Sequence, residues 1–595
     1  MTFSRRVVAW SALGLLTLSI AACAGSAPEA RSARRRTRTP AASPFPSKSS
    51  LTKLADAPVP PTPVQNVASA PEWNVVIDTS EATSRAEARF AKTAAATNQG
   101  LTYSKELRCV ARELARFQVE HGAPPNERLK RFMIAACGMT SASVGAMIQM
   151  GDATPDVPDE TILAGWQKTL VLPAQLKGNA VGVWMARDKK RVAFIVAFTK
   201  AEPEMVMSPV DASGAFTVRG AAPPNTEYVL GLVNQGGGVT RCEPDPATPL
   251  PLFTVRCAMA PGDKSAWVEV VGRAQGRLLM RSLGLALARR DASAPVSFVA
   301  STRAPRPVTT SVELRTAVLE GVNQMRTAAK LAPVALAPAQ TQTNERLAPH
   351  FFAASFKSDL PRGDLVGLGL MAGWDVEGAI KRGNLFSALL SQTTNANEWL
   401  DFALEVPMGR LTMLGAEARQ IAIGVAAPAD VGGLGAVVTT YDMFTSTDHR
   451  ADAALVFRQV EKARMGRGLP PPTRMEGVPE ITEMARLVNA GQRDAEDALD
   501  AAMVAVRDRS QRSVRGWVLT TNQLEAVSLP PELLGAGPLD LALEVTHHKE
   551  PGAAWASYVV FLVTPSLPPG ADSAPTPQLQ ALGWRTSRGG TDATW

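Results

Sequence analysis

The stretch Ser311–Phe444 constrains the fold of this chain more than any other part of the sequence. Five apolar residues at its start fall at helical spacing and make one face: Leu314, Val318, Leu319, Val322 and Met325. Two more helices are predicted around residues 347–352 and 399–404, followed by two short apolar runs at 421–427 and 436–444. A Gly-Gly pair separates these runs, which is typical of paired strands. The order predicts helices packed on a mostly antiparallel sheet, so the fold class is α+β.

Short motifs within this stretch resemble the bacterial CAP superfamily, also called the SCP or pathogenesis-related superfamily, over residues 312–445. The motifs are Val322-Asn323-Gln324-Met325-Arg326, then Leu331-Ala332-Pro333-Val334, the tryptophan Trp399, the segment Pro407-Met408-Gly409-Arg410, and Ile423-Gly424-Val425-Ala426. The resemblance implies modules built as α-β-α sandwiches. It also implies a cleft in which the family carries two histidines and acidic partners.

The chain departs from the family pattern at that cleft. Gly409 stands where the second histidine is expected, and the turn around Lys357 replaces the first. With Glu398 these residues mark the cleft position, and Glu398 and Glu405 are its nearest acidic candidates. His350 falls inside the preceding helical pattern, so we interpret it as a core or helix-surface histidine. A metal held by imidazoles needs more than one of them, and the resemblance therefore favours the fold without a metal or cofactor.

Residues 1–23 have the pattern of a bacterial export signal. Arg5 and Arg6 precede an apolar run whose end, Ile20-Ala21-Ala22-Cys23, resembles a lipobox, which implies that Cys23 becomes the lipidated first residue. Acyl chains such as palmitate would then hold the protein to a membrane. Ala24 after the cysteine resembles the sorting pattern of outer-membrane lipoproteins. We therefore expect the protein to be anchored in the outer membrane, facing either the periplasm or the cell surface. The alternative is a plain secretory signal or a membrane anchor.

A predicted disordered tether, 24–75, follows the signal, because the segment is dense in Pro, Ser, Ala and Thr and lacks periodicity. This segment also explains the net charge of +7, since the signal carries +2, residues 24–40 carry +4 and only +1 remains for the rest. The basic run is suited either to anionic lipid head groups or to a solvated spacer. A nearly neutral body gives no support for nucleic-acid binding.

Cysteine usage fits an exported protein. With Cys23 lipidated, four cysteines remain: Cys109, Cys137, Cys242 and Cys257. An even remainder predicts two disulfides, and closeness in sequence favours Cys109–Cys137 and Cys242–Cys257 among the three pairings. Buried free thiols are the alternative.

The flanking segments predict further modules. Residues 85–200 contain two helices, a tryptophan and a hairpin, which is the order of the 310–447 module, while 201–300 is a β-rich, sandwich-like domain. In 451–565, four residues repeat the central helix and loop at a constant offset of 138: Val460, Arg464, Leu469 and Pro471 match Val322, Arg326, Leu331 and Pro333. We therefore predict that 451–565 duplicates the CAP-like module of 310–447, with residues 85–200 as a degenerate third module. Residues 566–595 are predicted to form a flexible tail.

No catalytic motif is present. The five histidines are His121, His350, His449, His547 and His548. They are spread along the chain, and we interpret the last two as part of a hairpin loop rather than a metal site. No nucleophile elbow, zinc-protease motif or phosphate loop occurs. These observations favour a non-catalytic lipoprotein of the cell envelope that binds another envelope protein or the cell wall. The alternatives are a carrier of lipids or small hydrophobic ligands, and a hydrolase with an unrecognised site.

Overall fold

The structure is a computed structural model, and it describes residues 45–59, 71–96, 100–140, 144–153, 157–169, 179–200, 205–275, 277, 279–291, 294–357, 359–390, 393–426, 433–476 and 478–565. The predicted export signal, Cys23, most of the tether and the tail lie outside these residues. The chain divides into two compact units, one containing Ser47–Met371 and Asn384–Thr440, the other containing Ala372–Gly383 and the residues from Tyr441 onward.

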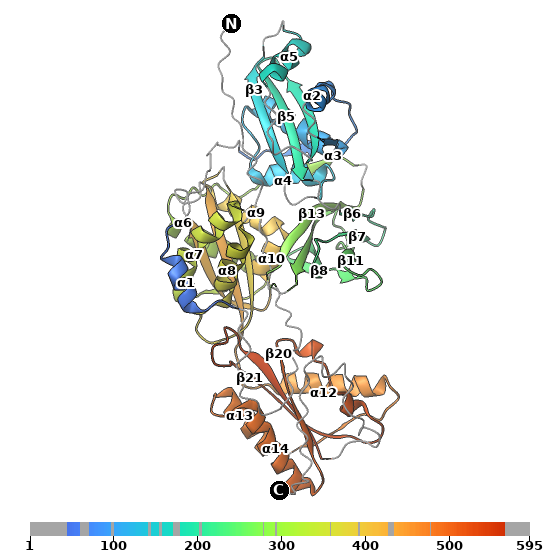
Figure 1. The fold of residues 1–595 in the computed structure, drawn as a ribbon, viewed down its shortest axis with the longest axis vertical. Coiled ribbons are helices and arrows are strands. Elements are labelled where there is room, and N and C mark those ends of the chain that lie inside the picture. The colour runs from blue at the N-terminus through green and yellow to red at the C-terminus, as the bar shows by residue number, and fades with distance from the viewer. Residues whose placement is uncertain are drawn as a thin grey trace. The chain divides into compact units, whose positions relative to one another are not determined.

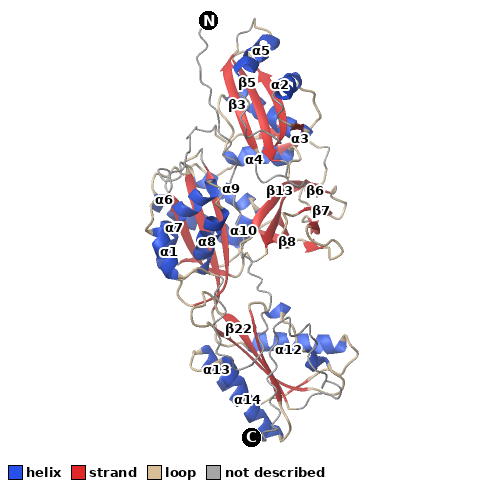
Figure 2. Cartoon of the chain, viewed as in Figure 1, coloured by secondary structure: helices blue, strands red, loops and turns tan. Residues whose placement is uncertain are grey.

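The chain combines helices with several separate sheets (Figures 1 and 2). Three of the four-stranded sheets share one topology. Their strand orders are β2-β4-β5-β3, β15-β17-β18-β16 and β19-β21-β22-β20, so the first, third, fourth and second strands of each set lie in that sequence. In every set the short first strand pairs in parallel with the third. A duplicated module requires a common strand order, and all three sheets have it.

The elements of the first set are α2 (Arg85–Ala96), β2 (Thr102–Tyr103), α3 (Lys105–His121), α4 (Glu127–Ala136), β3 (Gly145–Asp152), α5 (Asp159–Thr169), β4 (Asn179–Arg187) and β5 (Arg191–Lys200). Those of the second are α6 (Ser311–Ala328), β15 (Ala335–Leu336), α7 (Pro338–Phe356), α8 (Leu360–Ala372), β16 (Ala379–Leu390), α9 (Ala396–Glu405), α10 (Pro407–Leu414), β17 (Ala418–Ala426) and β18 (Leu434–Phe444). Those of the third are α12 (Arg450–Met465), β19 (Thr473–Arg474), α13 (Pro479–Asn489), α14 (Ala495–Ser510), β20 (Arg515–Thr521), η2 (Leu524–Ala526), η3 (Pro531–Leu534), β21 (Asp540–His548) and β22 (Ser557–Thr564).

Successive side chains of a strand point to opposite faces of the sheet. Apolar side chains on both faces therefore allow helices to pack on both. In β22, Val560 and Leu562 pack with α12, while Val559, Phe561 and Val563 pack with α13 and α14. The first set behaves in the same way, because Phe194 and Val196 face α2 and α5. The alternating residues Ala193, Ile195 and Ala197 of β5 face α3 and α4. The layers are therefore helix, sheet and helix. The fold is multi-domain α+β.

The β-rich segment consists of two four-stranded sheets with orders β10-β11-β7-β6 and β13-β12-β8-β9. Its strands are β6 (Val206–Met207), β7 (Ala215–Ala221), β8 (Thr226–Gln235), β9 (Gly238–Arg241), β10 (Glu243–Pro244), β11 (Leu252–Ala258), β12 (Ser265–Ala274) and β13 (Arg281–Arg289). Side chains from both sheets share one core, which makes the segment a sandwich. A separate two-stranded pair joins β1 (Val75–Ile77) to β14 (Val296–Phe298).

The structure contains both predicted disulfides. Cys109 in α3 is bonded to Cys137 at the end of α4, and Cys242 after β9 is bonded to Cys257 in β11. Each bond joins neighbouring elements, as closeness in sequence suggested. The first fixes two consecutive helices, and the second lies in the sandwich core.

Part of the predicted disordered tether is ordered, which corrects that prediction. Residues Lys48–Ala55 form the helix α1, whose first turn is capped by the Ser47 side chain. Leu51 is the single buried residue of this helix, and it fits against Gly369 in α8, where an added Cβ would lie 2.3 Å from a Leu51 methyl. Asp56 also forms an ion pair with Arg346. One buried residue in eight leaves no periodic pattern in the sequence, so composition alone suggested a spacer.

The segment between the predicted helices around 347–352 and 399–404 contains further regular structure. It contains helix α8 and strand β16, neither of which the sequence pattern predicted. Gly367 and Gly369 lie in α8 because neighbouring leucines, Leu279 and Leu51, occupy the space that a Cβ would need. Glycine normally lowers helix propensity, and here tertiary packing outweighs that cost of about 1 kcal/mol per residue. Among the described residues, no helix is long and apolar enough to cross a membrane.

Candidate functional site

The three residues predicted to mark the cleft have separate environments. Lys357 is exposed at the C-terminal end of α7, where its backbone N–H donates to the carbonyl of Ala353. Glu398 lies in the first turn of α9, and Gly409 is buried within α10, which begins at Pro407. The structure thus keeps the helices of the predicted cleft but gives each marker residue its own partners.

Gly409 has no room for a side chain. An added Cβ would lie 2.2 Å from the carbonyl oxygen of Ala403 and 3.0 Å from the ring of Phe386. The first distance is far below van der Waals contact, and its partner is a backbone atom that cannot rotate away. The position of the expected second histidine is therefore filled by the module's own core.

The N-terminus of α10 is occupied by a carboxylate from the sandwich. Glu269 in β12 is only 1% exposed, and its Oε2 accepts a hydrogen bond from the backbone N–H of Met408 at 2.9 Å. Free N–H groups at a helix N-terminus attract an anion, and Pro407 supplies none itself. The segment that would present a cleft histidine instead binds a buried glutamate of the same chain.

Further hydrogen bonds join the sandwich to this segment. Asn234 in β8 donates from Nδ2 to the carbonyl of Glu405 at 2.7 Å, and Arg410 donates from Nη1 to the carbonyl of Gly236 at 2.7 Å. These contacts flank the Glu269 contact on both sides. The α9–α10 corner is therefore a packing surface within the first unit.

Glu405, one of the two acidic candidates, is held by arginines of α4. Arg128 donates from Nε to its Oε1 at 2.6 Å, and Arg131 donates from Nη2 to its Oε2 at 2.9 Å. The Arg131 guanidinium also lies over the ring of Phe402, 3.7 Å from its centroid. A carboxylate paired in this way is committed to structure rather than to acid–base chemistry.

Glu398, the other candidate, has an unusual environment. The residue as a whole is half-buried, but its Oε1 is buried and has no hydrogen-bond partner. Burial raises the pKa of this carboxyl to about 7, opposed by a hydrogen bond with Thr393 and helped by the nearby charges of Glu72 and Glu127. Glu398 therefore changes charge near neutral pH.

We expect Glu398→Gln to stabilise the protein at pH 8 by on the order of 2–3 kcal/mol. Because the folded pKa of about 7 lies above the ordinary value of 4.5, the fold favours the neutral acid. Wild-type stability should fall as pH rises from 4.5 through 7, whereas the glutamine cannot ionise and should show no such loss. Urea unfolding of the mature chain between pH 4.5 and 8 measures this difference. Glu417→Gln, at an exposed position of the same module, is the control. Parallel curves for Glu398→Gln and wild type would contradict the assignment.

His350 is a core histidine, as interpreted. It is 1% exposed within α7, and its Nδ1 lies 3.2 Å from Nη2 of Arg362. Burial and then the Arg362 charge lower its pKa, so the ring is neutral near pH 7. Among the described residues, no group of three or more His, Cys, Asp and Glu side chains is arranged to hold a metal.

One polar cluster in the second unit was not foreseen from the sequence. His449 and His547, spread along the chain, meet with a distance of 2.8 Å between Nε2 of His449 and Nδ1 of His547. Asp452 accepts from Nδ1 of His449 at 2.7 Å, and Phe444 stacks on His547 with 4.2 Å between ring centroids. His547 and His548 are the last two residues of β21, so the expectation that they belong to a hairpin loop is wrong. No local pattern signals the pair, because its members are 98 residues apart.

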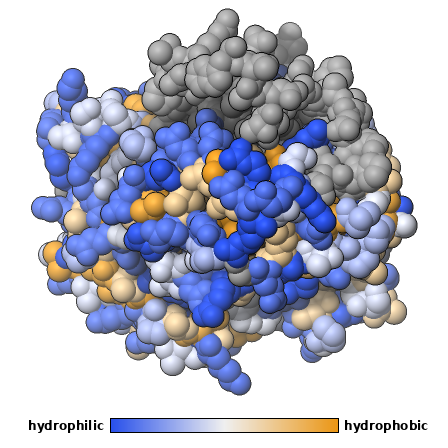
Figure 3. All heavy atoms as spheres, turned by 90° about the horizontal axis from the view of Figure 1, so that it is seen from below, coloured by the Kyte–Doolittle hydropathy of each residue, from blue (hydrophilic) through white to orange (hydrophobic). Residues whose placement is uncertain are grey.

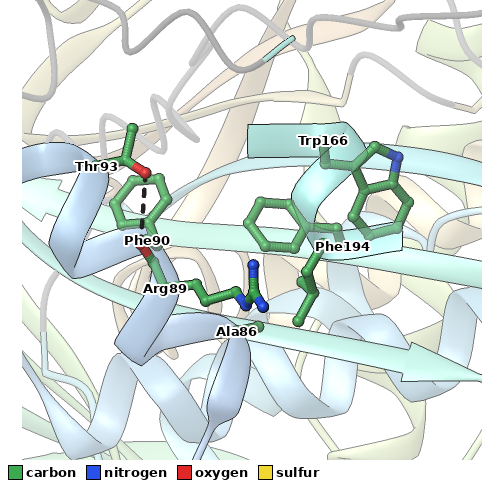
Figure 4. Close-up of a pocket in the computed structure, with 7 residues that line it drawn as sticks. Ala86, Arg89, Phe90, Thr93, Trp166 and Phe194 are labelled. Atoms are coloured by element: carbon green, nitrogen blue, oxygen red, sulfur yellow. Dashed lines mark hydrogen bonds between the residues drawn. The ribbon is translucent and has the colours of Figure 1, made fainter. Parts of the chain in front are cut away.

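The first module contains a small apolar pocket between α2, α5 and β5 (Figure 4). Its walls include the aromatic rings of Phe90, Trp166 and Phe194, and the last two have centroids 5.2 Å apart. The Arg89–Glu160 ion pair also joins α2 to α5. The pocket has a volume of about 20 Å³, which is space for one water molecule rather than for a lipid.

Comparison with known proteins adds a distant structural similarity. No family model matches the chain, and no curated protein matches it. Among solved structures, the chain is similar to a cysteine-rich secretory protein from Staphylococcus aureus. The alignment covers 44% of this chain and 84% of that one, with 12% sequence identity and a TM-score of 0.18. A similarity of this size assigns no function.

Proposed function

We propose that this protein is a non-catalytic lipoprotein of the cell envelope that acts as a binding or scaffold protein through its CAP-like modules. The observation that carries this proposal is the closed corner at Gly409, where the core and Glu269 occupy the place of the expected cleft. A module that keeps its helices and sheet but has a filled cleft still offers a rigid surface for binding. It no longer has the open cleft in which catalytic residues could act on a substrate.

The pocket by Trp166 gives no support to a lipid carrier at that site. Ligand sites that bury a drug-sized molecule have volumes of hundreds of Å³, whereas the pocket by Trp166 has about 20 Å³. The face shown in Figure 3 is mainly hydrophilic with scattered apolar residues, so this face offers no large apolar patch for a lipid surface. A binding role through polar and small apolar contacts fits both features.

Attachment to the envelope rests on Cys23. We expect the wild-type protein to take up labelled palmitate in growing cells and to fractionate with membranes, and Cys23→Ala to lose both. Cys109→Ala, which removes a thiol held in a disulfide, is the control and should keep the label. Equal labelling of wild type and Cys23→Ala would contradict lipidation at this residue.

The binding role can be tested from the outer face of the sandwich. Val206 and Leu252 are both exposed, at 60% and 58%, and share one face because their partners on β7, Arg219 and Ala221, are two residues apart. A photo-crosslinking amino acid at Val206 should give a discrete adduct with one envelope protein or with the peptidoglycan. Tight lipid in an organic extract of the purified protein, with no adduct, would instead support a carrier. Hydrolysis of an envelope substrate by the purified protein would support an enzyme.

A further inference from the structure

We propose that His449 and His547 form an acid-sensitive catch that holds the segment Phe444–His449, which links β18 to α12, on the core of the second unit. The catch is independent of the proposed binding function. It rests on the arrangement of two histidines, one carboxylate and the aromatic residues around them.

The segment is fixed at both ends and exposed between them. Phe444 stacks on the His547 ring in a nearly parallel orientation, and it also meets the Tyr558 ring at 4.9 Å between centroids. His449 is 6% exposed and stands immediately before α12. Residues 445–448, between these two rings, are exposed. Both rings therefore contact the same partner, His547.

The hydrogen bond between the two rings requires a single proton. With Asp452 accepting from Nδ1 of His449, a neutral His449 offers Nε2 as an acceptor, and Nδ1 of His547 donates to it. One added proton can be accommodated, because His449 then becomes an imidazolium paired with Asp452 and donates to a neutral His547. A second proton places two donors and two positive charges face to face at 2.8 Å, which breaks the bond.

The other groups around His547 do not relieve this repulsion. On its own strand His548 is a further titratable ring, and from α13 the amide of Asn489 lies 3.2 Å from Nδ1. From β22 comes Tyr558, whose hydroxyl is hydrogen-bonded to Lys381. Strand β16 contributes that Lys381 cation and Arg382. Asp442, a nearby carboxylate from β18, is hydrogen-bonded to Arg382 at 3.0 Å. Asp452 already serves His449.

The direction of the pH dependence follows from these contacts. Burial, then the charges of His449 and His548, lower the pKa of His547 to about 4, below the ordinary value of 6.5. The neutral ring is thus favoured in the closed state, and the contribution of the catch is complete above pH 6.5. It is lost progressively as pH falls from 6.5 towards 4, with about a tenfold increase in the opening equilibrium per pH unit for one linked proton.

Hydrogen–deuterium exchange of the mature chain at several pH values, corrected for intrinsic rates, tests this proposal. Peptides covering 441–453 should open about 40-fold more often at pH 4.5 than at pH 6.5. His547→Gln, which keeps an amide donor and cannot titrate, should abolish this dependence. His121→Gln, in the other unit, is the matched control and should retain it. Equal pH dependence in wild type and His547→Gln would overturn the proposal.

Two measurements on the wild-type protein keep the test valid if His547→Gln does not fold. An NMR titration should give His547 a pKa near 4, and a value near 6.5 would overturn the catch. Zinc added at pH 7 should leave exchange of 441–453 unchanged. Strong protection by zinc would instead identify the pair as part of a metal site and would also overturn the proposal.

Discussion

Arg326→Met and Arg464→Met should each destabilise the protein by about 4 kcal/mol, the largest losses that we expect from single substitutions. Both arginines are fully buried, and neither has a carboxylate partner in its hydrogen bonds. Each guanidinium instead donates to four backbone carbonyls. For Arg326 these belong to Ala332, Met413, Gly415 and Ala418; for Arg464 they belong to Pro470, Leu533, Gly535 and Gly537.

The loss of stability is expected because the substitution removes the guanidinium N–H donors while the backbone carbonyls that accept from them stay buried. Methionine fills a similar volume but cannot donate, so four carbonyls would lose their partner inside the protein. In each module the arginine ties the end of a helix to the loop that follows it and to the chain entering the third strand. Nε of Arg326 bonds Ala332 and Nε of Arg464 bonds Pro470, both six residues further along.

Urea or thermal unfolding of the mature chain measures both losses. Arg419→Met and Arg467→Met, at exposed positions of the same two modules, are the controls and should change stability by less than about 0.5 kcal/mol. Because the two arginines lie in different units, their effects should add in the double variant. If one substitution lowered the stability strongly and the other did not, the two sets of hydrogen bonds would not make equivalent contributions to stability.

Gly409→His, which restores the histidine expected from the family, should destabilise the protein by about 3 kcal/mol or more and should not create zinc binding. The added Cβ alone would overlap the carbonyl oxygen of Ala403, and the imidazole would enter the space of the Phe386 ring. The α9–α10 corner would have to separate, and the contact between Glu269 and Met408 would weaken with it.

Thermal unfolding and zinc titration calorimetry test this prediction together. Ala416→His places the same side chain at an exposed position beyond α10 and is the matched control, with little expected change. A folded Gly409→His protein that binds zinc with wild-type stability would show that the corner is a closed form of a working cleft. That result would also contradict the proposed non-catalytic role.

Local patterns were sufficient where a residue's neighbours in sequence are also its neighbours in space. The apolar stripe of α6 predicted that helix, and closeness of cysteines predicted both disulfides. The 138-residue offset found Arg326 and Arg464, whose matching hydrogen bonds the structure then showed. The glycine at position 409, where the family resemblance implies a histidine, was likewise found from the sequence, because residue identity alone shows it.

Tertiary structure decided the features that depend on distant contacts. Helix α1 is ordered because Leu51 meets Gly369, and α8 tolerates its glycines because leucines fill the space beside them. Glu398 acquires its raised pKa from burial beside Glu72 and Glu127, residues far away in the chain. The sequence by itself determined helix α6 and the two disulfides, since these follow from local spacing. Only the fold brought His449 to His547 and Glu269 to Met408, because burial and charge act through space.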